Sequence, residues 1–216
     1  VAGDTNGVSD VFVKDLATGA VTLVNSTAAG VGGGSSSSLG VFSADGTKVL
    51  FRSNSSNLVA GDTNGTLDVF VKDLATGAVT LVNSTAAGVG GNGSSSSVAF
   101  SADGTKVLFL SASSNLVAGD TNGAQDVFVK DLATGVVTLV SGTGAGVGGN
   151  NSTASGVFSA DGTKVLFQSF ASNLVAGDAN SASDLFVADL TLPAQREPLT
   201  SRTVELDFMF VANSPG

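Results

Sequence analysis

Short apolar runs recur along the chain, and clusters of turn residues separate them. The run Val49-Leu50-Phe51 follows the turn Ala44-Asp45-Gly46, and the run Val69-Phe70-Val71 precedes the turn Ala75-Thr76-Gly77. An Asp-Gly turn between two apolar runs is typical of a β-hairpin. The pattern therefore predicts two hairpins that form one four-stranded antiparallel sheet. The expected strands are 41–43, 47–51, 68–74 and 78–82.

This pattern is repeated along the chain with a constant period. The equivalent segments that begin at Val1, Val59, Val117 and Val175 set a period of 58 residues without insertion. One such unit is too short to bury a core alone, so neighbouring units are expected to stack. We expect one repeat domain over 1–216, in which the pieces are a half unit at 1–27, full units at 28–85, 86–143 and 144–201, and a last strand at 202–216.

The apolar triplets are contiguous and do not alternate with polar residues. Both faces of Val49-Leu50-Phe51 and Val69-Phe70-Val71 should therefore be covered, as in a sheet that lies between two other sheets. The phenylalanines support this interpretation because most of them recur at the period and are expected in the core between sheets. The recurring positions are Phe12, Phe42, Phe51, Phe70, Phe100, Phe109, Phe128, Phe158, Phe167 and Phe186.

Two polar features recur with the same period. The Gly- and Ser-rich stretches at 28–40, 86–97 and 144–156 would read as flexible linkers in isolation, but their recurrence predicts a fixed connection between units. Lys72-Asp73 and its copies are interpreted as a solvated strand end, where a local charge pair contributes little stability.

The repeat resembles the TolB-type β-propeller repeat, which begins each blade with Phe-Ser-Pro-Asp-Gly. The matching residues are the segment from Phe42 to Phe51, the segment from Asp68 to Leu74 and the Thr-Gly turn that follows. Alanine stands at 44, 102 and 160, where the family usually has proline. The resemblance implies an all-β fold, a β-propeller of about four 58-residue, four-stranded antiparallel blades, whereas TolB-like propellers commonly have six.

The pattern breaks after Leu190, where 191–198 replaces the usual turn and 198–200 retains at most a degraded fourth strand. Beyond it, the segment from Val204 to Phe210 alternates as a half-buried strand should. We expect this strand either to close the ring against the incomplete N-terminal blade or to pair with another chain, because both remove exposed sheet edges.

Composition and charge narrow the function. The chain contains no His and no Cys, which excludes an imidazole base, a thiolate nucleophile, a disulfide and the usual zinc, haem and iron–sulfur centres. Its net charge of −9 opposes nucleic acids and anionic membranes and favours cations. No apolar run approaches the roughly 20 residues of a transmembrane helix, so neither nucleic acid nor a transmembrane segment is expected.

A polar loop precedes each of the strands that begin with an aspartate. Its pattern, Asp-x-Asn-x-x-x-Asp, places oxygen-bearing side chains at positions 1, 3 and 7, an arrangement that can surround a hard cation such as calcium. It is similar to a shortened version of the calcium loops of FG-GAP propellers and EF-hands, with one acidic position fewer. The candidate calcium ligands are Asp4, Asn6, Asp10, Asp62, Asn64, Asp68, Asp120, Asn122, Asp126, Asp178, Asn180 and Asp184.

A second interpretation of these loops needs no metal. Asp62 and Asn64 would form Asx-turns, and Asp68 would accept hydrogen bonds from backbone N–H groups. The fourth copy lacks the glycine of the others, since Ser181 replaces it, and is the weakest metal candidate.

These features predict a non-enzymatic scaffold for adhesion or interaction, stabilised by calcium and secreted or at the cell surface, with the periplasm as second choice. Its long-loop face would bind a protein or a glycan. One alternative is a self-assembling subunit of a fibre or ring, a homo-oligomer whose terminal half blades complete each other. A weaker alternative is a propeller hydrolase or its gating domain.

Overall fold

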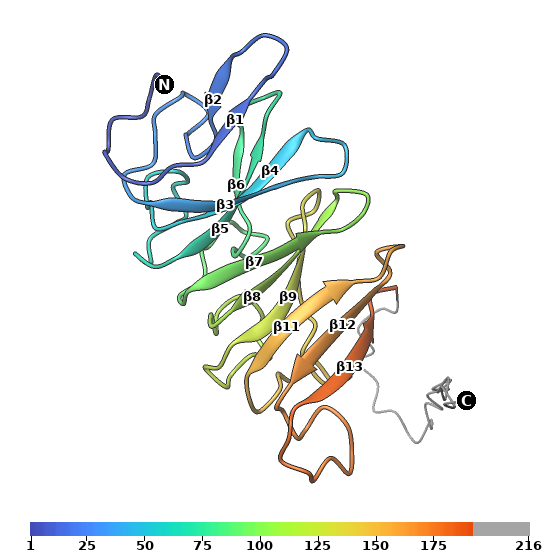
Figure 1. Cartoon of the computed structure of the whole chain (residues 1–216). Helices are drawn as coiled ribbons and strands as arrows, with labels where there is room; N and C mark the ends of the chain where they lie inside the picture. The colour runs from blue at the N-terminus through green and yellow to red at the C-terminus, as the bar shows by residue number, and fades with distance from the viewer. Residues whose placement is uncertain (192–216) are drawn as a thin grey trace, which may run out of the picture.

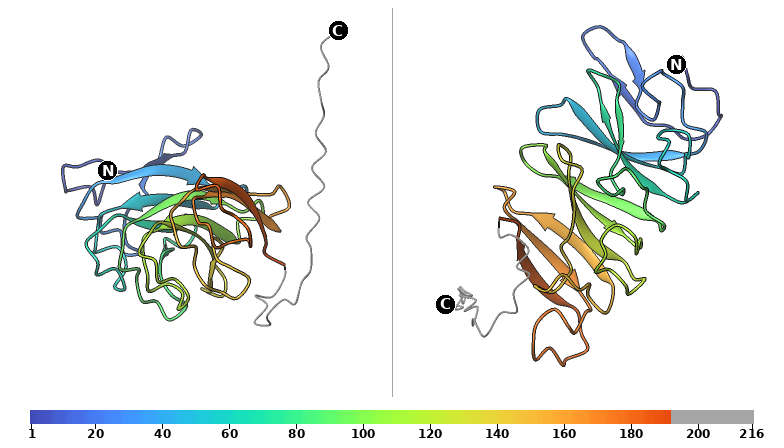
Figure 2. Two further views of the ribbon diagram at one scale, coloured as in Figure 1. Left: turned by 90° about the horizontal axis from the view of Figure 1, so that it is seen from below. Right: turned by 180° about the vertical axis from the view of Figure 1, so that it is seen from behind.

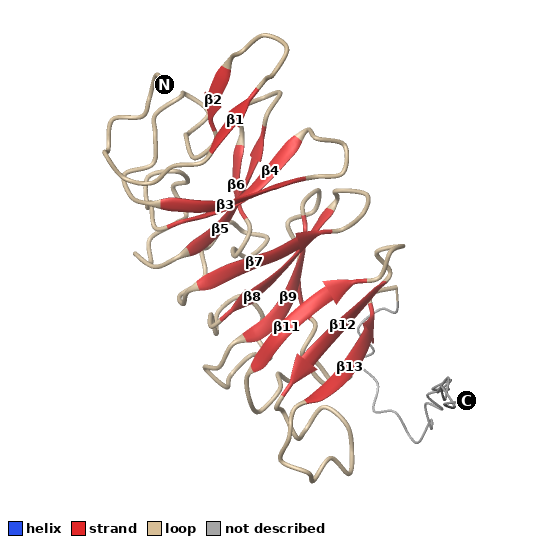
Figure 3. Cartoon of the chain, in the orientation of Figure 1, coloured by secondary structure: helices blue, strands red, loops and turns tan. Residues whose placement is uncertain are grey.

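A computed structural model describes residues 1–191, and within this range the chain consists of strands and loops (Figure 1, Figure 3). The described residues include no helix of the length and apolarity needed to span a membrane. The prediction of an all-β chain is confirmed. The strands are β1 (Phe12–Lys14), β2 (Val21–Leu23), β3 (Ser37–Phe42), β4 (Lys48–Ser53), β5 (Asp68–Asp73), β6 (Val79–Leu81), β7 (Ser95–Phe100), β8 (Lys106–Ser111), β9 (Asp126–Asp131), β10 (Val137–Leu139), β11 (Thr153–Phe158), β12 (Lys164–Ser169) and β13 (Asp184–Asp189).

The strands form four antiparallel sheets in which neighbours in the sequence are neighbours in the sheet. Strands β3 to β6 and β7 to β10 make two four-stranded sheets, β11 to β13 make a three-stranded sheet, and β1 pairs with β2. The predicted hairpin turns lie where expected, between β3 and β4 and between β5 and β6. Gly46 and Gly77 take positive φ angles of 70° and 74° in these turns, a conformation that glycine adopts at little cost.

The sheets stack face to face along an arc, from the β1–β2 hairpin at one end to the β11–β13 sheet at the other (Figure 1, Figure 2). The described residues therefore form an open, partial propeller. The strand predicted from Val204 to Phe210 lies outside the described residues, as does nearly all of the segment 191–216 that follows the last repeat.

The first strand of each sheet begins earlier than the sequence pattern predicted. Strand β3 starts at Ser37 and not at Val41, so the last part of the stretch 28–40 is strand and not connection. The strand accepts serine because buried hydroxyls satisfy one another: Ser37 Oγ donates to Ser53 Oγ at 2.8 Å, and Ser53 Oγ to Ser55 Oγ at 2.9 Å. Strands β7 and β11 extend in the same way into the other two stretches.

The remainder of each stretch is an ordered connection, as predicted. Backbone bridges pair Ser26 with Gly32, and the same bridge recurs one and two periods later. The recurrence of one hydrogen-bond pattern in three copies identifies a fixed structural element rather than a flexible linker.

The core lies between sheets, and the second and third strands of the two four-stranded sheets contribute both of their faces to it. Val49, Phe51 and Phe70 pack with Val24 of the preceding sheet. Leu50, Val69 and Val71 pack on the following sheet, against the partners Val107, Phe109 and Phe128. The prediction that the apolar triplets are covered on both faces is confirmed for these two sheets, because alternate residues of one strand face opposite neighbours.

The phenylalanines of the second and third strands form stacked pairs. Phe51 lies opposite Phe70 in register, and their ring centroids are 5.4 Å apart. The pairs in the next two sheets have centroid distances of 5.5 and 5.4 Å. Such a pair contributes roughly 0.5–1.5 kcal/mol beyond the burial of its area. The predicted role in the core between sheets is confirmed for these phenylalanines, whereas the same prediction is wrong for Phe12 and Phe42, which are 42% and 53% exposed.

The lysines of β5 and β9 are buried, so the interpretation of Lys72-Asp73 as a solvated strand end is wrong. Lys72 Nζ donates to the backbone carbonyl of Ser26 at 2.7 Å, and Lys130 Nζ donates to that of Ser84 at 2.6 Å. Burial lowers the pKa of both ammonium groups, that of Lys130 to about 8. Each lysine thus ties its sheet to the connection that leaves the preceding sheet.

Leu108 and Leu166 occupy the same position in consecutive sheets and provide a matched test of stacking. Leu108 is fully buried between sheets, whereas Leu166 is exposed on the last sheet. We expect Leu108→Ala to lower the free energy of unfolding by about 2–5 kcal/mol and Leu166→Ala to lower it clearly less. Urea denaturation measures both changes. Equal losses would contradict the different environments of the two leucines.

Candidate functional site

The candidate site is formed by the long loops that carry the Asp-x-Asn motif. The first loop precedes β1 at residues 1–11, and the second, third and fourth loops join the second and third strands of their sheets at 54–67, 112–125 and 170–183. Because the strands are antiparallel, these loops lie at the same ends of the strands as the connections between sheets. A hydrogen bond from the backbone N–H of Gly34 to Asn57 Oδ1, at 2.9 Å, joins a connection to the loop. The short hairpin turns lie at the opposite ends of the strands.

The asparagine of each loop is held by the loop itself. Asn64 Oδ1 accepts a hydrogen bond from the backbone N–H of Thr66 at 2.7 Å, which is an Asx-turn. Its Nδ2 donates to the carbonyl of Gly91 at 2.7 Å and to Asp68 Oδ1 at 3.0 Å. The equivalent Asx-turn bond is made by Asn6, Asn122 and Asn180. The Asx-turn interpretation therefore holds for the four asparagines, which position the loop and its second aspartate.

The two aspartates of the second loop are buried together. Asp68 Oδ1 accepts hydrogen bonds from the side-chain amides of Asn64 and Asn83, and its Oδ2 has no partner, so the prediction that Asp68 accepts from backbone N–H groups is wrong. Asp62 is only 5% exposed, and its Oδ1 has no partner either. Burial, and then the negative charge of Asp68, raise the pKa of Asp62 to about 6. This pair of carboxyl groups is in an environment that disfavours two negative charges.

The third loop has the same arrangement with one partner changed. Both carboxylate oxygens of Asp120 are buried without a partner, and the side chain is 3% exposed. Asp126 accepts hydrogen bonds from Ser141 Oγ at 2.7 Å and from Asn122 Nδ2 at 2.8 Å. Burial, and then the charge of Asp126, raise the pKa of Asp120 to about 6. Asp120 thus places a buried carboxyl group inside the loop, where the backbone N–H of Asn122 partly offsets the effect of burial on its pKa.

The first and fourth loops are open. Asp4 is exposed, and Asp10 is half-buried, with its Oδ2 unpartnered and its Oδ1 accepting from Asn25 Nδ2 at 2.5 Å. In the fourth loop Asp178 and Asp184 are half-buried. The twelve predicted residues therefore fall into two buried loops and two open ones.

The difference between these loops follows from the connections around them. The second loop is contacted by the preceding connection at Asn57 and by the following one at Gly91, and the third loop is contacted in the same two ways. The first loop is bonded to the following connection alone, through Gly33. The fourth is bonded to the preceding one, through Asn150. The two loops with buried aspartate pairs are thus the two that connections on both sides contact.

Residues on the connections also shape the site, and the sequence analysis did not identify them. Asn83 donates to Asp68 and accepts from the backbone N–H of Val69 at 3.0 Å. A Cβ atom on Gly61 would overlap the carbonyl oxygen of Gly88, so glycine allows the close approach of loop and connection. The period was the available signal, because it places Asn25, Asn83 and Ser141 at equivalent positions just after β2, β6 and β10.

The donor set limits the chemistry of these loops. Residues 1–191 contain no group of three or more acidic, His or Cys side chains that could hold a metal ion. Each buried loop instead offers two carboxyl groups, and backbone carbonyls and water would have to supply the remaining ligands of a cation. The separate aspartates at 45, 103 and 161 belong to hairpin turns, where hydrogen bonds from neighbouring serines lower each pKa to about 2.

Comparison with known proteins relates the chain to solved structures. No family model and no curated protein matches. A putative TolB from Agrobacterium tumefaciens is 14% identical over 87% of this chain and 55% of its own, with a TM-score of 0.48. The tricorn protease is 15% identical over 86% of this chain and 16% of its own, with a TM-score of 0.55. The β-propeller domain of the Trilobed protease from Pyrococcus furiosus is 15% identical over 68% of this chain and 36% of its own, with a TM-score of 0.42.

This chain covers less than two thirds of each of these structures, and the low identities mean that the likeness concerns the fold alone. The superposition on the tricorn protease agrees with the stacked antiparallel sheets described above. The described residues therefore form an open, partial β-propeller.

Proposed function

We propose that this chain is a non-enzymatic repeat scaffold for adhesion or interaction, which calcium stabilises. The observation that carries the proposal is the burial of unpartnered carboxylate oxygens in the two interior loops, at Asp62 and Asp68 and at Asp120. A buried carboxylate without a partner is costly, so each loop must bind either a proton or a cation. Above the raised pKa values, a cation is the better partner.

Calcium suits these loops better than other common cations. It accepts oxygen ligands in flexible arrangements of six to eight, and it uses carboxylates, backbone carbonyls and water. A site with only two carboxylates should be weak, as in extracellular modules with dissociation constants of about 10⁻⁴–10⁻³ M. Such a site would be filled outside the cytoplasm, which supports a secreted or cell-surface location, with the periplasm as the second choice. Binding would also reduce the self-repulsion of a chain with a net charge of −9.

The repetition of the loops supports a scaffold rather than an enzyme. The two buried loops present nearly the same side chains, and the chain has no His or Cys to act as base or nucleophile. The long loops and the connections lie at the same ends of the strands and form one surface, the long-loop edge, where loop residues such as Thr63 and Thr121 are exposed. A protein or glycan that binds this edge would meet the same groups at each blade.

Calcium should raise the thermal stability of the chain through the two buried loops. At a calcium concentration 100 times the dissociation constant, each filled site adds about 2.7 kcal/mol. The double variant Asp62→Asn/Asp120→Asn should lose this gain, and in chelator it should melt above the unmodified chain because two buried charges are gone. Melting curves with calcium and with chelator measure both effects.

The matched control for this experiment is Asp4→Asn, which changes the same loop position in an exposed copy. It should keep the calcium-dependent gain. If the unmodified chain melts at the same temperature in calcium and in chelator near neutral pH, the two loops hold no stabilising cation. If the double variant keeps the full gain, calcium binds elsewhere.

The dependence of stability on pH should reveal the buried carboxyl groups directly. The pKa values of Asp62 and Asp120 rise from 3.8 to about 6 in the folded chain. Their contribution to stability is therefore complete below about pH 4 and is lost as the pH rises through 6. In chelator, the free energy of unfolding should fall between pH 4.5 and about 7, and calcium should remove this fall. A flat profile in chelator would contradict the raised pKa values.

The scaffold role itself predicts a ligand on the long-loop edge. Arrays of immobilised glycans and extracellular proteins should retain the chain in calcium and retain it less in chelator. Thr63→Arg together with Thr121→Arg should weaken retention, whereas Thr47→Arg on the opposite edge should not. Retention that is insensitive to the loop variants would place the ligand elsewhere, and absence of retention on all surfaces would count against a binding role.

A further inference from the structure

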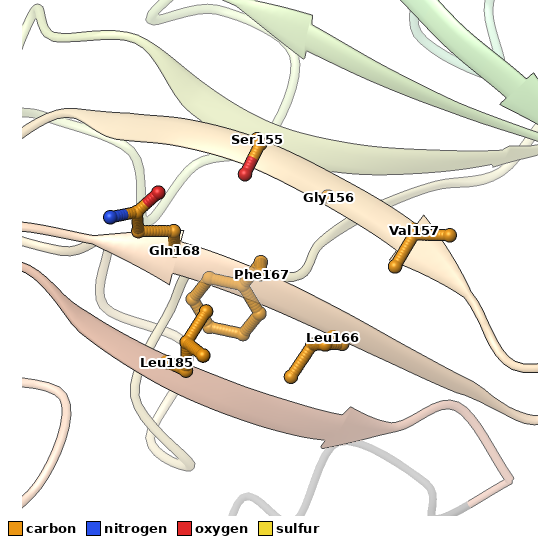
Figure 4. A pocket seen from close by; sticks show the side chains of 7 residues that line it. All are labelled: Ser155, Gly156, Val157, Leu166, Phe167, Gln168 and Leu185. Atoms are coloured by element: carbon orange, nitrogen blue, oxygen red, sulfur yellow. The ribbon is translucent and has the colours of Figure 1, made fainter.

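The last sheet presents an apolar face whose equivalents in the other sheets are buried. Leu166, Leu185 and Val187 are 40%, 69% and 56% exposed, and none of residues 1–191 covers them. The residues one period earlier, Leu108, Val127 and Val129, are covered by the β11–β13 sheet and are almost completely buried. Figure 4 shows Leu166, with Leu185 on one side and Val157 on the other, among the residues that line a pocket in this sheet. The exposed face therefore has the composition of an interface between sheets.

The opposite end of the arc exposes the complementary side of the same interface. Phe12 and Phe42 are 42% and 53% exposed, whereas Phe70 and Phe128, which repeat Phe12, are fully buried. In the interior, it is this phenylalanine side of one sheet that packs on the leucine and valine side of the sheet before it. The described residues thus expose both halves of this internal interface, one at each end of the arc.

We propose that a second copy of this chain covers the exposed face, so that the β11–β13 sheet of one copy stacks on the N-terminal end of the next. The proposal is independent of calcium and rests on the repeat, since the contact would bring together the kinds of residue that already pack between interior sheets. The interface is heterologous, and such a head-to-tail contact can extend to a filament or close to a ring. Exposed apolar patches of this kind commonly mark association sites.

Stacking of faces fits the two ends better than completion of a shared sheet. Strands β11 to β13 correspond to the first three strands of a four-stranded sheet, and β1 and β2 correspond to the last two. If the β11–β13 sheet of one copy joined the β1–β2 hairpin of another in one sheet, that sheet would contain two third strands, β13 and β1. Face-to-face contact needs no strand to be displaced and buries the side chains at both ends.

Sedimentation of the full chain over a concentration series tests the proposal. The weight-average mass should rise with concentration above the 21.0 kDa of one chain. Leu185→Arg should remain monomeric, and so should Phe12→Arg, because each removes one side of the contact by placing a charge on it. Val89→Arg is the control, since Val89 is similarly exposed but lies on a connection in the interior of the arc.

Mixing the two end variants gives the decisive result. Leu185→Arg and Phe12→Arg each keep one intact and complementary end, so a one-to-one mixture should form dimers and nothing larger. If Phe12→Arg alone still dimerises, the contact joins two identical faces and the head-to-tail proposal is wrong. A chain that stays monomeric at all concentrations would also overturn it, and would indicate that the chain covers the face itself.

Discussion

The structure depends on burial of apolar side chains between sheets. Strands β4, β5, β8 and β9 have apolar residues on both faces, so their sheets cannot bury these side chains without a neighbour on each side. The dominant favourable term is the area removed from water, roughly 25 cal/mol per Å² of apolar surface. A repeat of this kind is stable within a stack, and only the outermost sheets of the stack lack a neighbour on one face.

The same stacking buries charged side chains and determines which hydrogen-bond partners they have. Interior sheets bury Lys72, Lys130, Asp68 and Asp126, yet the lysines bond to backbone and hydroxyl oxygens and lie away from the carboxylates. Each lysine finds its oxygens on the preceding connection, so its positive charge is solvated by the protein. The aspartates keep unpartnered oxygens in their environment, as at Asp62. The interior therefore contains lysines whose ammonium groups have partners and carboxyl groups, at Asp62, Asp68 and Asp120, that keep buried oxygens without one.

The sequence was sufficient to predict the sheets, because their period, apolar triplets and Asp-Gly turns are local signals. It was not sufficient for features that depend on a neighbouring unit. The strand at Ser37 was missed because serine is polar, and its pairing with Ser53 and Ser55 appears only across strands. The burial of Lys72 was missed because its partner, Ser26, lies in another unit. The orientation of the Asn64 side chain depends on its hydrogen bond to the carbonyl of Gly91, which lies in the connection to the next sheet.

The candidate site shows this limit most clearly, because its copies are nearly identical in sequence and different in structure. Asp4 and Asp62 occupy the same position in the repeat, but the first is exposed and the second is buried beside a second carboxylate. The difference lies in whether one connection or two contact the loop. Burial of these carboxyl groups therefore follows the number of interior blades, not the number of Asp-x-Asn motifs. In a stacked repeat, a motif specifies the ligand atoms, and the neighbours determine whether those atoms need a ligand.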